Sequence, residues 1–468
     1  MNLIWFRNDL RLTDNPALQA AAAQGQPLLA VVVLTPTQWQ RHGDAPRKLA
    51  FWRDALQCLS DDLARLNIGL RVLHADEFEG CAPALLDLCR QVQAKGLYFN
   101  YEYPLNERRR DRAVKRLLRS EGLRCEGCHG DLMLEPGAVL SAKGEPFRVF
   151  TPFGRVWRKE ILMRDLACLP APRPQSPLAI ESDAIPSLGT SYDRQLWPVG
   201  EEAAAQRLYR FAAADLANYA EQRDFPALDA TSSLSAYLNT GQLSVRQCLN
   251  VAYHTLGEHW LESQWVTELI WREFYRHLLV AFPDLNRLAP FRPEVEARLR
   301  WQDNPERFGA WCRGETGFPI VDAAMRQLLA TGWMHNRLRM VVASFLTKLL
   351  GVDWRLGAEF FMQQLIDGDF ASNLGGWQWS ASVGADAAPY FRIFSPQRQA
   401  ERFDPRDAFV CQWLPELASL PARQRQDPQI SSQVRGLAPV IDYRAARAQA
   451  LAAYKAAGAR ATDNFSGR

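Results

Sequence analysis

Short apolar runs of strand length recur through the first hundred residues, and their spacing constrains the fold more than any other feature. The runs are Leu3–Phe6, Leu28–Leu34, Leu70–Leu73 and Leu97–Tyr101. The segments between them have helical spacing, and Asn15 before Pro16 indicates a helix start with a capping side chain. Strands that alternate with helices predict a doubly wound parallel sheet. No G-x-G-x-x-G follows the first run, so the main motif of a dinucleotide-binding fold is missing.

A proline-rich stretch from Leu169 to Gly200 interrupts this alternation, and it has neither a helical nor a strand period. We interpret it as part of a long connector. The later segments nearly all have helical spacing, namely 201–218, 244–255, 264–280, 320–330, 335–350 and 357–365. The sequence therefore predicts an α/β domain over 1–130, an interdomain linker over 131–200 and an all-helical domain over 201–468.

Composition limits the class of protein. The chain of 468 residues has 55 basic and 52 acidic side chains, so an anionic partner has to be held by a local patch. Nine cysteines at irregular spacing are typical of a reduced cytosolic chain. The longest apolar run is far shorter than the ~20 residues of a membrane helix, and the N-terminus does not resemble a signal peptide. We therefore expect a cytoplasmic protein without a membrane partner.

Tryptophan is the unusual residue of this composition. The chain has 15 tryptophans, and most of them lie in the second half, between Trp260 and Trp413. This enrichment indicates that the helical part of the chain uses indole rings for more than packing.

The segment Cys125–His129 matches the C-x-x-C-H pattern of haem attachment. That chemistry belongs to exported proteins, and no second C-x-x-C exists to complete a zinc site. We therefore expect no haem and no metal, and we interpret the match as a chance occurrence in a loop after Gly122.

A predicted helix places Glu268, Trp271 and Tyr275 on one face, with Arg272 and Arg276 on the neighbouring stripe. This face could be a binding surface, and an ordinary amphipathic helix with packed aromatic residues would have the same spacing. Neither interpretation is excluded by the spacing alone.

A second helical segment puts Asn336 between Trp333 and Met340 on one face. An amide between an indole ring and a thioether suits a pocket that holds a flat heterocycle by stacking and hydrogen bonds. A packed core face is an equal alternative.

Two further segments carry polar groups that could bind a cofactor. Asp367 and Asp369 flank Gly368, and we favour hydrogen-bond acceptors over metal ligands because no histidine lies near them in the sequence. The hydroxyl cluster Thr231–Ser235 leads into helical sequence and could cradle a phosphate or be an ordinary helix cap.

The basic run from Arg108 to Arg119 is interpreted as a solvated helix face. No Ser/His/Asp arrangement, H-E-x-x-H or P-loop is present, so hydrolytic chemistry has little support.

These segments together resemble the DNA photolyase and cryptochrome family, and they are most similar to bacterial class I cyclobutane pyrimidine dimer photolyases. The motifs are WFRNDLRLTDNPAL, NERRRD, TSSLSAYLNTG, ELIWREFYRHL, TGFPIVDAAMRQLLATGWMHNRLRM and LIDGDFASNLGGWQWSASVGADAAPYFRIFSP. They span nearly the whole chain in the order of the family. The resemblance implies an α/β antenna domain, a connector and a helical domain that binds FAD and DNA.

The implied activity is that of a light-dependent carbon–carbon lyase. Excited reduced FAD would donate an electron to a flipped-out dimer, the cyclobutane bonds would split, and the electron would return. The residues that match the family's FAD site are Tyr219, Thr231, Ser232, Ser233, Leu234, Ser235, Arg272, Arg339, Asp367, Gly368, Asp369 and Asn373. Of these, Asn373 matches the position beside flavin N5, and with Glu268 it is expected to contribute to catalysis.

The implied partner is UV-damaged DNA, single- or double-stranded, with little preference for flanking sequence. The residues that match the family's substrate and DNA contacts are Arg223, Glu268, Trp271, Tyr275, Asn336, Arg337, Met340, Trp379 and Arg392. Three tryptophans, Trp377, Trp354 and Trp301, match the chain that passes electrons to the flavin from the protein surface.

For the antenna, His42, Asn106 and Glu107 match the pattern that binds 5,10-methenyltetrahydrofolate. An 8-hydroxydeazaflavin is the less favoured chromophore. Folate-type members often carry Lys where this chain has Arg287, which keeps the charge and changes the geometry.

We expect a monomer. The alternatives are a cryptochrome-type blue-light photoreceptor that binds FAD without repair activity and a non-catalytic flavin-containing DNA-binding protein. The pair Asn336 and Met340 favours dimer repair.

Overall fold

The structure is a computed structural model, and it describes residues 1–457. The chain forms two compact units. Unit 1 comprises Met1–Ala217, Ser232–Asn286 and Ile366–Asp369. Unit 2 comprises Asn218–Thr231, Arg287–Leu365 and the chain from Phe370 onward.

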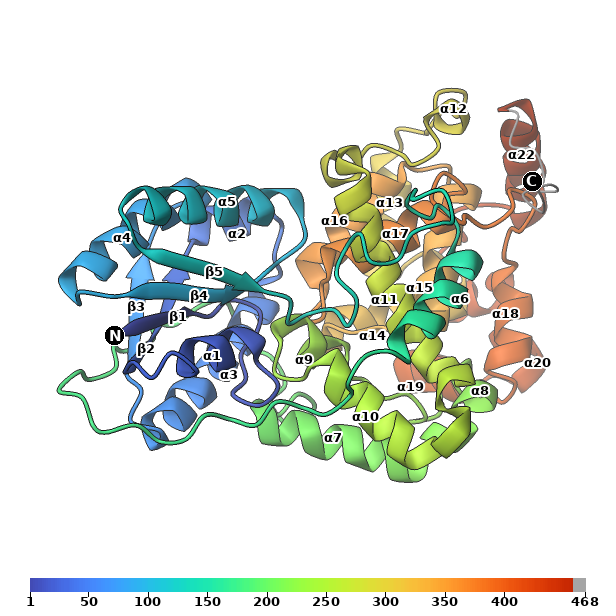
Figure 1. The fold of residues 1–468 in the computed structure, drawn as a ribbon. Helices are drawn as coiled ribbons and strands as arrows, with labels where there is room; N and C mark the ends of the chain where they lie inside the picture. Colours follow the sequence, from blue (N-terminus) through green and yellow to red (C-terminus); the bar gives the residue numbers. More distant parts are fainter. Residues whose placement is uncertain (458–468) are drawn as a thin grey trace. The chain divides into compact units, whose positions relative to one another are not determined.

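Unit 1 contains a parallel sheet whose strand order is β3-β2-β1-β4-β5 (Figure 1). The strands are β1 (Asn2–Trp5), β2 (Leu28–Leu34), β3 (Leu70–His74), β4 (Gly96–Asn100) and β5 (Arg124–Cys128). All pairings are parallel, which confirms the predicted doubly wound sheet. The placement of Cys125 and Cys128 in a loop is wrong, because both lie in strand β5, an edge strand with too few apolar residues to be noticed as a run.

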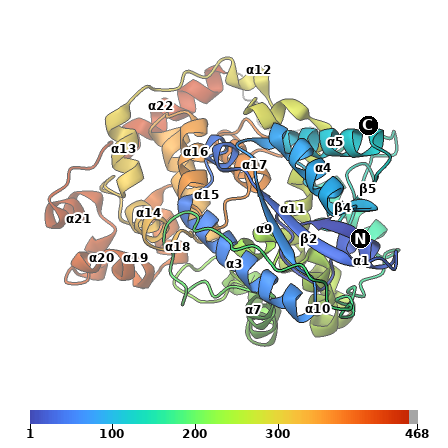
Figure 2. The same ribbon diagram turned by 90° about the vertical axis from the view of Figure 1, so that its left-hand side faces the viewer.

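Helices cover both faces of this sheet because the side chains of each strand alternate between the faces. On one face, Ile4 and Val32 pack with α1 (Pro16–Ala22) and α3 (Pro46–Arg65). On the other, Leu3 and Val31 pack with α4 (Cys81–Gln91) and α5 (Leu105–Ser120), and these two helices lie side by side (Figure 2). The predicted cap of α1 is confirmed, since the Asn15 side chain accepts a hydrogen bond from the amide of Leu18.

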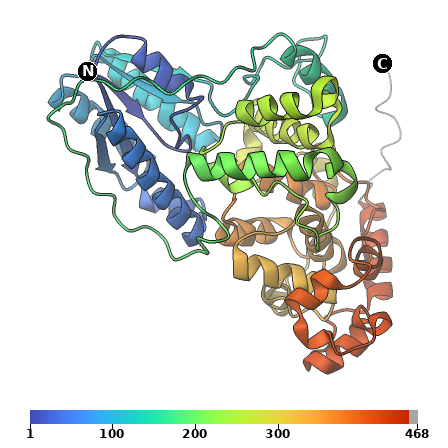
Figure 3. The same cartoon turned by 90° about the horizontal axis from the view of Figure 1, so that it is seen from below.

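The predicted connector is not uniformly irregular, because Phe150–Ile161 forms helix α6. The segment from Leu162 to Gly200 has no helix or strand and runs along α3 (Figure 3). Its contacts are specific: the amide of Thr190 donates to the carbonyl of Pro46 over 3.2 Å, and Ile185 is buried in the core beside α3. The connector therefore packs on the α/β part of unit 1. The boundaries at 130 and 200 stay predictions.

Unit 1 also contains helices from the part of the chain that was predicted to be all-helical. They are α7 (Glu201–Ala214), α9 (Ser235–Thr240), α10 (Val245–Leu256) and α11 (Gln264–Ala281). A capping box begins α10, since Ser244 and Gln247 each accept a hydrogen bond from the other's backbone amide. A shorter helix, α2 (Pro36–Arg41), precedes α3.

The regular secondary structure of unit 2 is all helical in its described residues, and loops join the helices. Its helices are α8 (Tyr219–Gln222), α12 (Pro293–Glu296), α13 (Pro305–Arg313), α14 (Pro319–Thr331), α15 (Asn336–Ser344), α16 (Trp354–Gln364), α17 (Phe370–Ser380), α18 (Pro396–Phe403), α19 (Ala408–Trp413), α20 (Ala422–Arg425), α21 (Pro428–Arg435) and α22 (Tyr443–Ala456). The predicted helix over 335–350 is divided, because a π-helical turn over Phe345–Leu349 follows α15. The next helix begins at Trp354, earlier than predicted, because the Asp353 side chain caps it. Within residues 1–457, no helix is both long enough and apolar enough to span a lipid bilayer.

Candidate functional site

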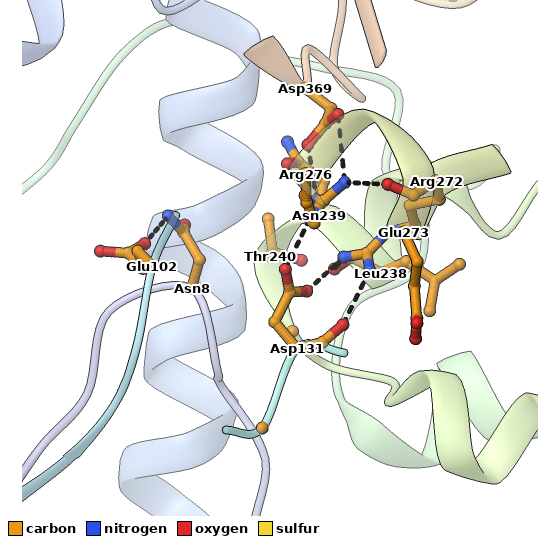
Figure 4. Close-up of polar contacts among 12 residues, drawn as sticks. Asn8, Glu102, Asp131, Leu238, Asn239, Thr240, Arg272, Glu273, Arg276 and Asp369 are labelled. Atoms are coloured by element: carbon orange, nitrogen blue, oxygen red, sulfur yellow. Dashed lines mark hydrogen bonds and ion pairs between the residues drawn. The ribbon is translucent and has the colours of Figure 1, made fainter. Parts of the chain in front are cut away.

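Polar side chains gather in unit 1 where β1 and β4 end, which is the point at which the strand order reverses. Ligands of open α/β sheets bind at such a point. Asn8 follows β1 and donates a hydrogen bond to Glu102, which follows β4, over 2.6 Å (Figure 4). Arg110 donates to the other oxygen of Glu102 over 2.6 Å. The basic run is thus not a uniformly solvated face, since Arg110 and the neighbouring Asp111 are buried.

The predicted antenna residues lie together beside this point. His42 follows α2, while Asn106 and Glu107 lie in the first turn of α5. The Asn106 amide lies 3.1 Å from Nε2 of His42, and Nδ1 of His42 lies 3.6 Å from the Glu107 carboxylate. Gln38 Nε2 contacts the same His42 nitrogen at 2.8 Å.

Glu107 is the unusual group of this set. Burial, followed by the charge of Glu102, raises the pKa of Glu107 to about 7. Its Oε2 atom is buried and has no hydrogen-bond partner among residues 1–457. A buried acceptor without a partner fits a bound group that carries N–H donors, and a pterin ring has such donors.

A buried arginine organises the centre of unit 1 (Figure 4). Arg276 on α11 donates from Nε to Asp131 over 2.6 Å and from Nη2 to Asp369 over 2.7 Å. Burial alone would lower the pKa of Arg276, but the carboxylates of Asp131 and Asp369 raise it above its usual value. Arg272, one turn earlier, also forms an ion pair with Asp131 and donates to the carbonyl of Leu238 over 3.2 Å.

This network fixes the predicted cofactor loop 367–369 on unit 1. Asn239 and Lys48 donate to the carbonyl of Gly368 over 2.9 and 2.8 Å. Asp367 is 5% exposed, and Asp369 is held by Arg276. Sequence reasoning placed Arg276 beside the binding face without a role and did not single out Asp131. The available signal was a second arginine one turn after Arg272 on the same helix.

Glu273 lies on the same helix, and its side chain points into the core. It is fully buried, and it accepts hydrogen bonds from the amides of Met133 and Leu134 and from the indole of Trp157. Burial outweighs these hydrogen bonds and raises the pKa of Glu273 to about 7. The role of Glu273 is to hold the start of the predicted linker against α11.

The hydroxyl segment before α9 has the conformation of a loop that can hold a ligand. Leu234 is the residue before the helix, and its apolar side chain cannot cap the first turn. Ser233 has a φ of 49°, in the left-handed region. The indole of Trp265 donates to the Ser232 hydroxyl over 3.3 Å. The segment therefore offers hydroxyls and helix-start amides, which suit a diphosphate.

The predicted binding face of α11 is backed by an aromatic residue that sequence reasoning missed. Phe150, the first residue of α6, stacks on Trp271 with ring centroids 3.7 Å apart and an interplanar angle of 6°. Tyr275 lies 5.5 Å from the Trp271 ring. Glu268 accepts a hydrogen bond from Gln264 over 2.8 Å. Phe150 begins a helix inside the predicted linker, and nothing in its local sequence indicates this contact.

In unit 2, the predicted substrate residues of α15 lie near an acid. Arg337 pairs with Asp224 over 2.6 Å, and its guanidinium lies 4.4 Å from the Phe403 ring centroid. The Met340 sulfur lies 4.0 Å from Nη1 of Arg337. Asn336 is the exposed first residue of the helix.

Other predicted residues of unit 2 lie on separate elements. Arg223 lies over the ring of Tyr219, 5.4 Å from its centroid. Arg392 lies in a loop and is exposed. Its backbone carbonyl accepts a hydrogen bond from the buried Lys348 over 3.0 Å. Trp379 is a partly exposed residue of α17.

The flavin-side residues of unit 2 use part of their polar groups within the protein. Nδ2 of Asn373 donates to the carbonyl of Ala358 over 2.9 Å, which fixes the orientation of the amide. Nε of Arg339 donates to the carbonyl of Met334 over 2.8 Å. Helix α17, which carries Asn373, has open space at Gly376, where an added Cβ would meet no atom within 4 Å.

The three predicted electron-transfer tryptophans differ in exposure. Trp377 and Trp354 are buried at 3% and 0% exposure, and Trp301 is partly exposed. Trp354 and Trp301 donate hydrogen bonds to the same oxygen of Glu296, over 3.0 and 3.2 Å. Trp377 packs on Phe361 with ring centroids 5.1 Å apart. Sequence reasoning missed Glu296.

The cysteine pair of β5 is unsuited to metal or thiolate chemistry. Burial raises the pKa of Cys125 to about 12 and that of Cys128 to about 11. No group of three or more His, Cys, Asp or Glu side chains could hold a metal ion in the part of the chain that the structure describes.

Comparison with known proteins places these features in a family. Residues 2–175 match the family model of DNA photolyase, and residues 265–456 match the FAD binding domain of DNA photolyase. The chain is 46% identical to the deoxyribodipyrimidine photo-lyase of Salmonella typhimurium, over 97% of this chain and 98% of that protein. It is 45% identical to the enzyme of the same name from Escherichia coli, with the same coverage. The chain belongs to the DNA photolyase family.

Solved structures agree with this assignment. A bacterial class III photolyase from Agrobacterium tumefaciens matches with a TM-score of 0.88 and 34% identity, over 98% of this chain and 97% of that one. A cryptochrome from Synechocystis matches with a TM-score of 0.82 and 28% identity, over 97% and 98%. Photolyases and cryptochromes thus share this fold, and the chain carries the FAD-binding domain of the family.

Proposed function

We propose that this chain is a light-dependent deoxyribodipyrimidine photo-lyase, which splits cyclobutane pyrimidine dimers in UV-damaged DNA. The observation that carries the proposal is the similarity, over almost the full length of both chains, to enzymes of that name. The stacked pair of Phe150 and Trp271 supports it, because it offers a rigid aromatic wall to a flat base. Cryptochrome-type signalling without repair has the same fold and is an outcome of the test below.

The chain's residues fit a bound FAD. When bound in its reduced form, FAD supplies the light-driven electron that splits the dimer and is then returned. Asp367, Gly368 and Asp369 would contact the cofactor from one loop, and Tyr219, Arg272 and Arg339 from other elements. The hydroxyls of Thr231, Ser232, Ser233 and Ser235, with the backbone at Leu234, would hold the diphosphate.

The electrostatics of the chain support a reduced flavin. Asn373 matches the family position beside flavin N5, and a neutral amide adds no negative charge there. Its orientation is fixed by the carbonyl of Ala358. Arg272 and Arg276 together offset the charges of Asp131 and Asp369.

Substrate recognition would combine stacking with a few hydrogen bonds. A damaged pair costs less to flip out than an intact one, which gives selectivity without sequence readout. Trp271 and Trp379 would stack on the dimer, Glu268 and Asn336 would bind base edges, and Tyr275 and Met340 would line the pocket. Arg223, Arg337 and Arg392 would contact phosphates, so binding should weaken as salt rises.

An electron chain and an antenna site complete the proposal. Trp377, Trp354 and Trp301 would carry electrons toward the flavin; Trp377 and Trp354 are buried, whereas Trp301 is partly exposed. His42, Asn106 and Glu107 would hold 5,10-methenyltetrahydrofolate as the antenna, supported by the buried acceptor of Glu107. We further propose domain boundaries near 130 and 200, a monomer and a cytoplasmic location.

The test is illumination of the purified, reduced protein with an oligonucleotide that contains a thymine dimer, with a dark sample as control. Blue light should restore undamaged thymines, and flavin absorbance without repair would favour the cryptochrome alternative. Glu268→Gln should lower dimer affinity about tenfold, the worth of one charge-assisted hydrogen bond. Its matched control is Glu262→Gln, which changes an exposed acid in the turn before α11 and should leave binding unchanged.

A further inference from the structure

Glu296 joins the two outer tryptophans of the proposed electron chain. It is the last residue of α12, and a single oxygen, Oε1, accepts hydrogen bonds from the indole nitrogens of Trp354 and Trp301 over 3.0 and 3.2 Å. The two indoles are separated by more than fifty residues in the sequence, so only the fold brings them to one carboxylate.

Arg355 forms an ion pair with the same carboxylate. Nη1 of Arg355 donates to Oε1 of Glu296 over 2.7 Å, and Nη2 donates to Oε2 over 2.9 Å, which makes a bidentate pair. Burial alone would raise the pKa of Glu296, but the hydrogen bonds from Arg355 and the indole of Trp354 lower it. Glu296 is therefore a charged carboxylate at neutral pH, and its position is fixed.

The cation of this pair is placed asymmetrically. The Arg355 guanidinium lies 4.5 Å from the centroid of the Trp354 ring. Over residues 1–457, no arginine or lysine lies above the ring of Trp301. Trp354 is fully buried, whereas Trp301 is partly exposed to water.

These contacts act on the positive charge that an indole acquires when it gives up an electron. A carboxylate hydrogen-bonded to the indole N–H stabilises that charge, and Glu296 does so at both rings. A guanidinium stacked on a ring opposes the charge, and Arg355 does so at Trp354. Water further stabilises the charge at Trp301, because an exposed ion is better solvated than a buried one.

We propose that Glu296 and Arg355 are positioning residues that draw the electron hole from Trp354 outward to Trp301. The proposal rests on the proposed function, in which oxidised flavin is the one-electron acceptor and Trp377 its first donor. Trp354 returns an electron to Trp377, Trp301 returns one to Trp354, and a soluble thiolate finally supplies one to Trp301 and becomes a thiyl radical. The indole protons stay in their hydrogen bonds to Glu296, so each step moves a single electron and no proton.

The first measurement tests the contact itself. In holoprotein with ¹⁵N-labelled tryptophan, Glu296→Gln should shift the indole N–H resonances of Trp354 and Trp301, assigned with Trp→Phe variants. Glu294→Gln is the matched control, because Glu294 is a nearby exposed acid that pairs with Arg292. Unmoved indole resonances in Glu296→Gln would overturn the proposal.

The second measurement follows the tryptophan radical by transient absorption after a flash on oxidised holoprotein. Glu296→Gln should lower the amplitude of the long-lived radical about tenfold, because a charge-assisted hydrogen bond changes an equilibrium by about that factor. Arg355→Gln should keep the amplitude and shorten the lifetime about tenfold, since the energy step from Trp354 to Trp301 becomes smaller. This different response separates a directing charge from general damage, and the Arg355 variant decides alone if Glu296→Gln does not fold.

Trp301→Phe separates the two levels of failure. If Trp301→Phe removes the long-lived radical while Glu296→Gln and Arg355→Gln behave like the wild type, the directing pair is refuted and the tryptophan route stands. If Trp301→Phe has no effect, the route itself is wrong and the inference fails with it. Repair by chemically reduced protein should stay unchanged in Glu296→Gln and Arg355→Gln. A wild-type protein that repairs no dimer would instead count against the photolyase proposal.

Discussion

Gly357 on α16 leaves room for the ring of Trp377, and filling that room is the sharpest test of the packing around the electron chain. An added Cβ would lie well inside contact distance of the Trp377 ring and 2.7 Å from Cδ2 of Leu346. The ring cannot easily retreat, because it packs on Phe361 and Trp311 with centroid distances of 5.1 and 6.0 Å. Gly357→Ala should therefore displace Trp377.

Two opposing effects set the size of the change. Replacing glycine with alanine inside a helix stabilises it by about 1 kcal/mol, because less backbone entropy is lost on folding. Overpacking a rigid core typically costs about 1–3 kcal/mol, and an indole enclosed by other rings should be near the upper end. The net expectation is a loss of about 1–2 kcal/mol, or a fall in Tm of roughly 2–8 °C for a unit of this size.

The assay is thermal unfolding followed by circular dichroism, together with flash photoreduction of the oxidised holoprotein. Gly309→Ala on α13 is the control, since its Cβ would meet only the flexible end of Arg313 at 3.1 Å, and its Tm should be unchanged or higher. Gly357→Ala should also slow photoreduction because Trp377 is displaced. A Gly357→Ala protein with the Tm and photoreduction of the wild type would refute the packing argument.

Three further predictions test separate parts of the molecule. Trp301→Phe should block photoreduction of oxidised flavin while repair by chemically reduced enzyme persists; unchanged photoreduction would place the surface donor elsewhere. Glu107→Gln should remove the near-UV antenna absorbance and keep the FAD spectrum, and a persisting antenna band would count against the folate site. Glu273 has a pKa of about 7 in the folded protein against 4.5 as its ordinary value, so the folded state binds more protons between these pH values. Unfolding free energy should therefore fall as pH rises from about 4.5 to 7. Glu273→Gln should reduce this dependence, of which Glu107 keeps its own share, and should be less stable by about 1–3 kcal/mol in urea unfolding at several pH values. Equal pH slopes for the two proteins would contradict the assignment.

The strands show which parts of the sheet can be predicted from the local pattern of apolar residues. Strand β2 was predicted with its exact bounds, because a strand buried on both faces of a parallel sheet is a continuous apolar run. Strand β5 was missed, because Arg124, Glu126 and Gly127 interrupt its apolar pattern and it lies at the sheet edge, where one side stays partly exposed. The interior strands and the edge strand β3 are thus specified by their own residues, whereas the edge strand β5 depends on its pairing with β4.

The candidate site shows the opposite balance. The family motifs brought most candidate residues into view, but not the groups that hold them. Arg276 meets Asp131 across 145 positions of sequence, and Glu296 meets Trp354 across 58. No periodicity relates such pairs, since their contact depends on how whole helices pack.

The sequence by itself determined the alternation of strands and helices, the helix starts at Asn15 and Ser244, and the family to which the chain belongs. These properties depend on residues within one or two turns of each other, or on motifs that are contiguous in the chain. The tertiary structure decided which charges are neutralised, which rings stack and which acids change their pKa. Those depend on burial and on partners from distant elements, as with Phe150 against Trp271 and one oxygen of Glu296 shared by two indoles. Electrostatic and stacking energies fall off over a few ångströms, so they are set by distances in space that the order of residues does not contain.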